Sequence, residues 1–70
     1  MTWTRVDLDG LRMLVCARGV VRPAESVDVV GLVVDGIPHG LYFPGGDLDR
    51  ALSLAGLPRV TADDLAWLDP

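Results

Sequence analysis

Residues 3–16 read WTRVDLDGLRMLVC, and residues 29–42 read VVGLVVDGIPHGLY. Each stretch holds an Asp-Gly pair, Asp9-Gly10 or Asp35-Gly36, between runs of apolar residues. A two-residue type I′ turn needs positive φ at both central positions, which Asp and Gly tolerate, and its twist matches that of the flanking strands. The two stretches therefore predict two antiparallel β-hairpins.

The first predicted hairpin is amphipathic when its register is counted outward from Asp9-Gly10. Side chains on a strand alternate between its two faces, so the two faces can be written out separately. We expect one face to pack on the core: Thr4, Val6, Leu8, Leu11, Met13 and Val15. We expect the other face, with Asp7 and Arg12 as a cross-strand ion pair, to stay mostly in water: Trp3, Arg5, Asp7, Arg12, Leu14 and Cys16.

The second predicted hairpin is apolar on both faces, and its register places Gly31 opposite Gly40. One face would carry Val30, Leu32, Val34, Ile37, His39 and Leu41, and the other Val29, Val33, Pro38 and Tyr42. A strand pair that is apolar on both sides must be covered twice. A chain of 70 residues has little left to do this, so the sheet closes into a barrel or a second subunit covers it. We expect partner contacts around Asp35-Gly36, through Val29, Val33, Tyr42 and Phe43, with Pro38 marking an edge strand.

The last third of the chain predicts two short helices. Asp47 is a candidate N-cap for a helix over residues 47–55, and Gly56 suits its C-terminal end. Thr61 is a candidate N-cap for a second helix over residues 62–68. With strands over about 3–43, residues 1–70 form a single small α+β domain: a four-stranded antiparallel meander followed by two C-terminal helices. We expect the second strand to run over residues 11–21, and a small SH3-like or partly open barrel is the alternative form of the sheet.

The composition argues against several classes of function. Cys16 and His39 are the only cysteine and the only histidine, so the chain can form neither an internal disulfide nor a zinc site of the usual Cys/His type. Nucleophile-elbow, paired-carboxylate and phosphate-loop motifs are lacking, so we expect no enzyme and no cofactor. A net charge of −4 argues against broad binding to nucleic acids or anionic membranes. The chain shows neither a signal peptide nor a membrane span, which predicts a cytoplasmic protein.

One segment suggests a different function. Residues 51–65 read ALSLAGLPRVTADDL, with alanines before a glycine turn and a capped second helix. This resembles a helix-turn-helix, and the resemblance implies a DNA-binding regulator that uses residues 48–68. In such proteins the N-terminal residues of the second helix reach the major groove. Here they are Ala62, Asp63 and Asp64, and two aspartates beside the single Arg59 would be repelled by phosphates.

The function that the sequence favours is therefore a non-enzymatic protein–protein interaction or assembly module. It would act as a homo-oligomer or as a subunit of a larger complex, because the core is thin and the second hairpin has two apolar faces. The helix-turn-helix-like DNA-binding regulator is one alternative. A small ligand-binding barrel with a pocket near Gly31 and Gly40 is the other.

Overall fold

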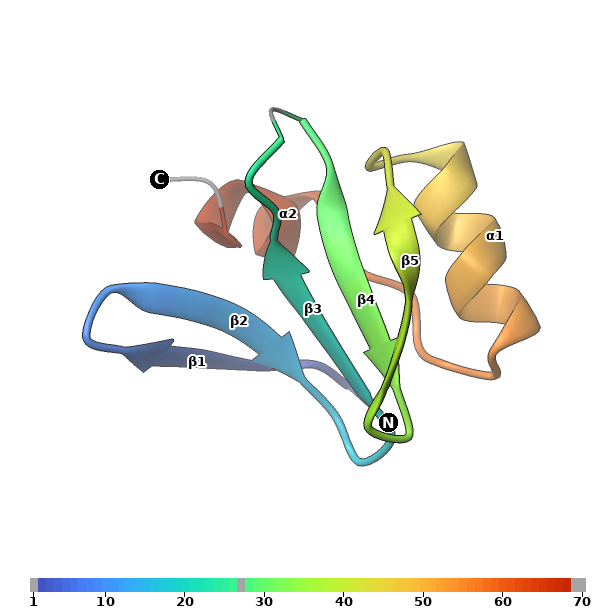
Figure 1. Cartoon of the computed structure of the whole chain (residues 1–70), viewed down its shortest axis with the longest axis horizontal. Coiled ribbons are helices and arrows are strands. Elements are labelled where there is room, and N and C mark those ends of the chain that lie inside the picture. The colour runs from blue at the N-terminus through green and yellow to red at the C-terminus, as the bar shows by residue number, and fades with distance from the viewer. Residues whose placement is uncertain (1, 27, 69–70) are drawn as a thin grey trace.

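The two Asp-Gly turns organise an open antiparallel sheet that two helices cover on one side (Figure 1). The computed structural model describes residues 2–26 and 28–68. The elements are β1 (Thr4–Leu8), β2 (Leu11–Val15), β3 (Gly19–Pro23), β4 (Val30–Val34), β5 (Ile37–Tyr42), α1 (Gly46–Leu54) and α2 (Ala62–Leu68). The strands follow chain order, with β1 and β5 at the two edges of the sheet. The predicted α+β class is confirmed, and the sheet has five strands where four were predicted.

The extra strand arises because the predicted second strand, over residues 11–21, is broken into β2 and β3. The chain turns between them, and the Cys16 N–H donates to the Gly19 carbonyl at 2.9 Å. Gly19 begins β3, at a place where a Cβ would lie 2.9 Å from Leu57 Cδ1. Only two residue pairs join β2 to β3. The β1–β2 hairpin therefore diverges from the rest of the sheet and projects from it (Figure 1).

Both Asp-Gly pairs form the turns that the sequence predicts. Asp9 and Asp35 have φ of 54° and 52°, and the glycines after them are also at positive φ. The register of the first hairpin is confirmed from Leu8 opposite Leu11 to Thr4 opposite Val15. The expected cross-strand ion pair joins Arg12 Nε to Asp7 Oδ2 at 3.5 Å.

The register of the second hairpin departs from the prediction beyond Pro38. A β-bulge between Leu32 and Val33 places Gly40 opposite Leu32, so that Gly31 faces Leu41 and not Gly40. His39 is the extra residue on β5, and it follows a proline that has no N–H to donate to the sheet. Because of the bulge, Tyr42 lies on the same face of the sheet as Val30, and Leu41 lies on the same face as Gly31. The predicted pairing of Gly31 with Gly40 is therefore wrong.

The two helices lie close to their predicted positions. α2 spans residues 62–68 as predicted, and Thr61 caps it by accepting a hydrogen bond from the Asp64 N–H at 3.2 Å. α1 begins and ends one residue before the predicted range, with Gly45 at its N-cap position and φ of 112°. Asp47 lies inside its first turn, so the prediction of Asp47 as the N-cap is wrong.

The C-terminal end of α1 follows the predicted glycine signal. Gly56 has φ of 71°, and its N–H donates to the Ser53 carbonyl at 3.1 Å. The Leu57 N–H donates to the Leu52 carbonyl at 2.9 Å, which completes a Schellman motif. After this sharp end the chain crosses to α2, which packs against β2. Neither helix is long and apolar enough to cross a membrane.

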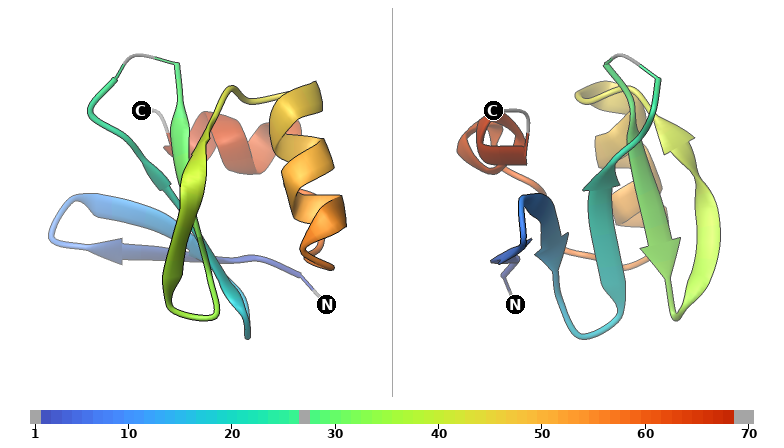
Figure 2. Two further views of the ribbon diagram at one scale, coloured as in Figure 1. Left: turned by 45° about the vertical axis from the view of Figure 1, so that its right-hand side comes forward. Right: turned by 60° about the vertical axis from the view of Figure 1, so that its left-hand side comes forward.

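The core lies between one face of the sheet and the two helices, and we call this face the inner face. Figure 2 shows both helices on the same side of the central strands. The sheet contributes Leu14, Val21, Val30 and Leu32, and Trp3 precedes β1. The rest of the core comes from the helices and their connection: Leu48, Ala51, Leu52, Leu57, Val60 and Leu68.

Candidate interaction surface

The first hairpin turns its more apolar face away from the core. Leu14 is completely buried and Trp3 nearly so, although both belong to the face that was expected to stay in water. Leu8 and Leu11, from the face that was expected to pack on the core, are 58% and 70% exposed. That assignment of the two faces is therefore wrong. The physical reason is that α2 provides partners for the arginines of the other face.

These partners form an arginine–tryptophan sandwich, made of Arg5, Trp67 and Arg12. The guanidinium carbons of Arg5 and Arg12 lie 5.6 and 5.1 Å from the centre of the Trp67 ring. Arg12 Nη1 donates to the Trp67 carbonyl at 2.7 Å, and Arg5 Nε donates to Asp64 Oδ1 at 2.9 Å. Arginine stems cover apolar surface while their charged ends stay near water. The charged face of the hairpin can therefore pack against α2.

The opposite face of the sheet is left as a continuous, largely apolar surface, which we call the outer face. The register places these side chains on it: Thr4, Val6, Leu8, Leu11, Met13, Val15, Val20, Arg22, Gly31, Val33, Pro38 and Leu41. Met13, Val15, Val20 and Val33 are half-buried, and Leu41 is 63% exposed. Contiguous exposed apolar surface of this kind marks interaction sites on proteins.

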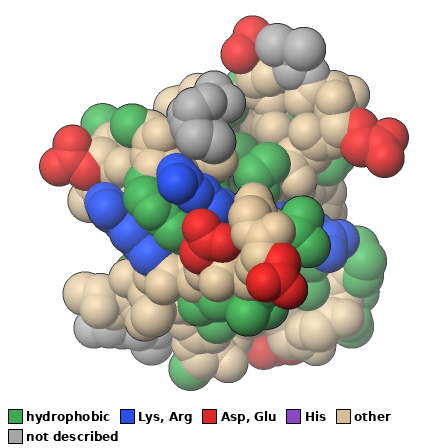
Figure 3. Space-filling model, turned by 90° about the vertical axis from the view of Figure 1, so that its left-hand side faces the viewer, with side chains coloured by type: hydrophobic (Ala, Val, Ile, Leu, Met, Phe, Trp, Pro, Cys, Tyr) green, Lys and Arg blue, Asp and Glu red, His purple; other side chains and the backbone are tan. Residues whose placement is uncertain are grey.

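The end of the molecule with the projecting hairpin shows how these side chains are distributed. In Figure 3, which looks at that end, hydrophobic side chains gather below the acidic ones, while arginine side chains flank a hydrophobic group on one side. At the tip of this hairpin, Leu8 and Leu11 flank the Asp9-Gly10 turn, and Asp7 pairs with Arg12 on the neighbouring strand.

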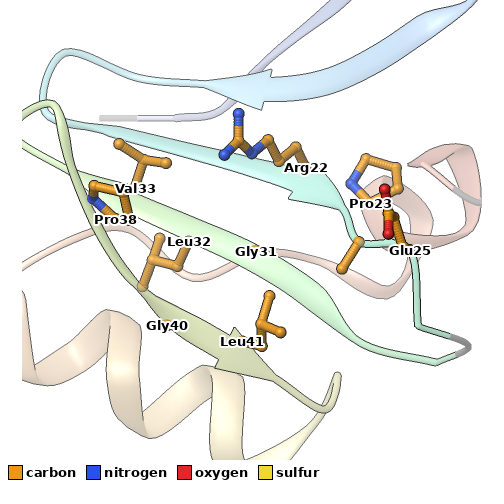
Figure 4. A pocket seen from close by; sticks show the side chains of 10 residues that line it. Arg22, Pro23, Glu25, Gly31, Leu32, Val33, Pro38, Gly40 and Leu41 are labelled. Carbon is orange, nitrogen blue, oxygen red and sulfur yellow. The ribbon is translucent and has the colours of Figure 1, made fainter.

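A hollow interrupts the outer face at Gly31. It measures about 490 Å³ and is lined by Arg22, Val33, Pro38 and Leu41 around this glycine, among other residues (Figure 4). A Cβ built on Gly31 would lie 3.7 Å from both Arg22 Cγ and Leu41 Cδ2. The hollow thus exists because residue 31 has no side chain between those of the two neighbouring strands.

The four predicted contact residues do not share one surface. Val33 lies on the outer face beside Pro38. Tyr42 is on the inner face and packs against the core, because the bulge reversed its direction. Val29 and Phe43 line a second hollow of about 730 Å³ that Leu65 of α2 also borders.

Sequence reasoning missed the main members of the outer face: Val6, Leu8, Leu11, Met13, Val15, Val20 and Leu41. The alternation along residues 3–16 did group the first five of them correctly. Nothing in that alternation says which group faces the helices. Trp3 was the available signal, because it belongs to the same face as Leu14 and large aromatic residues are highly buried on average.

The residues considered for chemistry or DNA contact lie apart from one another. His39 is exposed at the bulge, with its ring centre 6.2 Å from that of Tyr42, and Cys16 is half-buried against the core. Within residues 2–26 and 28–68, the structure brings together no group of three or more potential metal ligands. At the start of α2, Asp63 is exposed and Asp64 is held by Arg5.

Comparison of the chain with protein-family models, with curated proteins and with solved structures gives no match. The surface of the molecule is therefore the basis on which a function can be proposed. The outer face and its hollow are features that packing among the described residues does not account for.

Proposed function

We propose that this protein is a non-enzymatic interaction or assembly module that docks through its outer face and forms a homo-oligomer. The observation that carries the proposal is the apolar side of a sheet whose other side already holds the whole core. Burying a side chain such as leucine or valine contributes roughly 1.5–3 kcal/mol. A surface with several such side chains therefore gains substantially from a partner.

The size of the surface supports this proposal. The molecule measures 30 × 23 × 22 Å, so one of its faces offers several hundred Å². A standard protein interface buries roughly 800 Å² on each partner. A domain this small also gains little from its own core, and association with another subunit is a common remedy.

The edge strand β5 favours docking through the face rather than through an added strand. Pro38 lacks a donor and the bulge at His39 interrupts the regular edge. Natural sheets use both devices to prevent uncontrolled pairing at edges. Of the four predicted contact residues, Val33 belongs to the proposed surface. The cytoplasm remains the location we propose, on the basis of the single unpaired cysteine.

The proposal is tested by placing one charge on each side of the molecule and measuring the mass in solution by light scattering. Met13→Asp and Val33→Asp put a carboxylate on the outer face, whereas Leu54→Asp puts it on α1, where the leucine is 78% exposed. We expect wild-type protein and Leu54→Asp to show a multiple of the 7.5 kDa chain mass, and both outer-face variants to show the chain mass itself. A wild-type mass of 7.5 kDa at high micromolar concentration would contradict the proposal.

A further inference from the structure

We infer that the occupant of the outer face is a second copy of this chain, and that the tip of each β1–β2 hairpin sits in the Gly31 hollow of the other copy. This inference rests on the proposed function and adds the contact through which the copies meet. Three features carry it: a projecting apolar tip, a hollow on the same face, and opposite charges beside the two.

The tip is built to present apolar groups. Leu8 and Leu11 face each other next to the Asp-Gly turn and are the two most exposed large apolar side chains of the hairpin. The turn itself is held rigid, since the Gly10 N–H donates to Asp7 Oδ1 at 2.9 Å. Because β2 leaves β3 after two paired positions, the tip stands clear of the body of the sheet. A rigid apolar tip loses little conformational entropy when it docks.

The hollow suits such a tip in size and polarity. Its volume of about 490 Å³ lies within the range of roughly 300–1,000 Å³ found for clefts that hold ligands. Val33, Pro38 and Leu41 supply apolar walls, and Gly31 provides depth (Figure 4). The hollow does not interrupt the sheet, because Gly31 pairs with Arg22 of β3 and with Leu41 of β5.

Charge supports the same pairing. Asp9 lies at the tip between the two leucines. Arg22 lines the hollow and is the one charged side chain among those that the register of the described strands places on the outer face. The acidic Glu25, which follows β3, also lines the hollow (Figure 4). Among the described residues, neither Asp9 nor Arg22 takes part in an ion pair, whereas Arg5, Arg12 and Arg18 each do. Docking the tip in the hollow brings Asp9 and Arg22 of different copies together. Opposite charges at matching places set the orientation of a complex and speed its formation.

Symmetry then closes the assembly as a dimer. The tip and the hollow lie on the same outer face, but on opposite halves of the sheet. A two-fold rotation therefore places the first tip in the second hollow and the second tip in the first hollow. Each favourable contact occurs twice, and the apolar side chains between them are covered.

Disulfide trapping tests this arrangement directly. In a Cys16→Ala background, one variant carries Leu11→Cys at the tip and another carries Val33→Cys at the hollow. Oxidising a mixture of the two is expected to give a linked species of twice the 7.5 kDa chain mass, while neither variant alone gives it in quantity. Leu54→Cys replaces Leu11→Cys in the control mixture, which we expect to stay unlinked.

The outcomes separate the arrangement from the proposed function. If light scattering shows a dimer but the mixture links no better than either variant alone, the tip-in-hollow contact is wrong and self-association stands. If light scattering shows a monomer, the proposed function fails and this inference fails with it. Preferential linking in the mixture supports both.

The charge pair is tested by a double-mutant cycle on the dimer dissociation constant. Asp9→Asn removes the charge and retains a residue that tolerates positive φ, and Arg22→Gln removes the other charge. Each is expected to weaken the dimer roughly tenfold or less, as suits exposed ion pairs, and the double variant to be no weaker than either single one. Arg59→Gln is the control and is expected to have no effect. Strictly additive losses in the double variant would overturn the pairing of Asp9 with Arg22.

Discussion

Two arginines, Arg5 and Arg12, let the charged face of the first hairpin pack against α2. The guanidinium groups of Arg5 and Arg12 both lie over the Trp67 ring, and Arg12 also donates to the backbone carbonyl of Trp67. A cation over an aromatic ring contributes about 0.5–1 kcal/mol at an exposed site and more when desolvated. These contacts hold α2 on a face that looks hydrophilic in the sequence.

Replacing Arg12 by methionine is expected to destabilise the protein. Arg12→Met keeps most of the apolar stem but removes the hydrogen bond to Trp67, the contact with its ring and the ion pair with Asp7. The expected cost is about 1–2 kcal/mol in unfolding free energy. Urea denaturation followed by tryptophan fluorescence measures this cost. Arg59→Met, at an exposed position, is the matched control. Equal stability of the two variants would show that the sandwich does not hold α2.

The pair of Arg18 and Asp35 gives stability that depends on pH. Arg18 donates to both carboxylate oxygens of Asp35, at 3.1 and 3.0 Å, and this hydrogen bonding lowers the pKa of Asp35 below its ordinary value of 3.8. The carboxylate form is therefore favoured in the folded protein. Its contribution is complete above pH 3.8 and is lost as the pH falls through the lower, folded-state pKa.

We expect Arg18→Gln to remove this dependence. The wild-type protein should be more stable than the variant at neutral pH, and the difference should shrink in acid, below the ordinary pKa of Asp35. Denaturation curves recorded across the acid range measure the difference. A gap that stays constant through this range would show that the Arg18–Asp35 pair is not its source.

At the scale of elements, the β-bulge separates two glycines that look equivalent in the sequence. Gly31 and Gly40 would face each other in a regular hairpin. The bulge instead gives Gly40 a φ of 156° beside the Tyr42 ring, whereas Gly31 lies in regular strand. A Cβ on Gly40 would lie 3.1 Å from the Tyr42 hydroxyl oxygen.

Alanine substitutions at these two glycines test the bulge. Gly40→Ala is expected to destabilise the protein by about 1–3 kcal/mol, because it strains the backbone and crowds Tyr42. Gly31→Ala meets only ordinary contacts and is expected to be close to neutral or slightly stabilising in dilute solution. Thermal unfolding at low concentration compares them. Equal effects would indicate the regular register without a bulge.

Local signals in the sequence predicted most elements, but they did not predict the bulge or the faces. The Asp-Gly turns, the Thr61 cap and the Gly56 stop depend on a few neighbouring residues, and the structure confirms each of them. The bulge at His39 and the break after Val15 depend on pairing with distant strands. The burial of Leu14 in place of Met13 depends on where α2 docks, which alternation along one hairpin cannot reveal.

In the whole molecule, the helices cover the inner face of the sheet, whereas the outer face remains apolar and accessible to solvent. The helices and the arginine–tryptophan sandwich together occupy the inner face. The doubly apolar second hairpin suggested a partner near Asp35-Gly36. The structure extends the candidate surface across the sheet to Leu8 and Leu11 of the first hairpin.

In our proposal, copies of the chain meet through the outer face. The most direct measurement is an NMR dilution series, which follows the backbone amide signals of each residue as the protein concentration changes. We predict concentration-dependent shifts for Leu11, Met13, Val20, Val33 and Leu41, and constant positions for the exposed residues of α1. Signals that do not change with concentration, or changes confined to α1, would contradict the proposal.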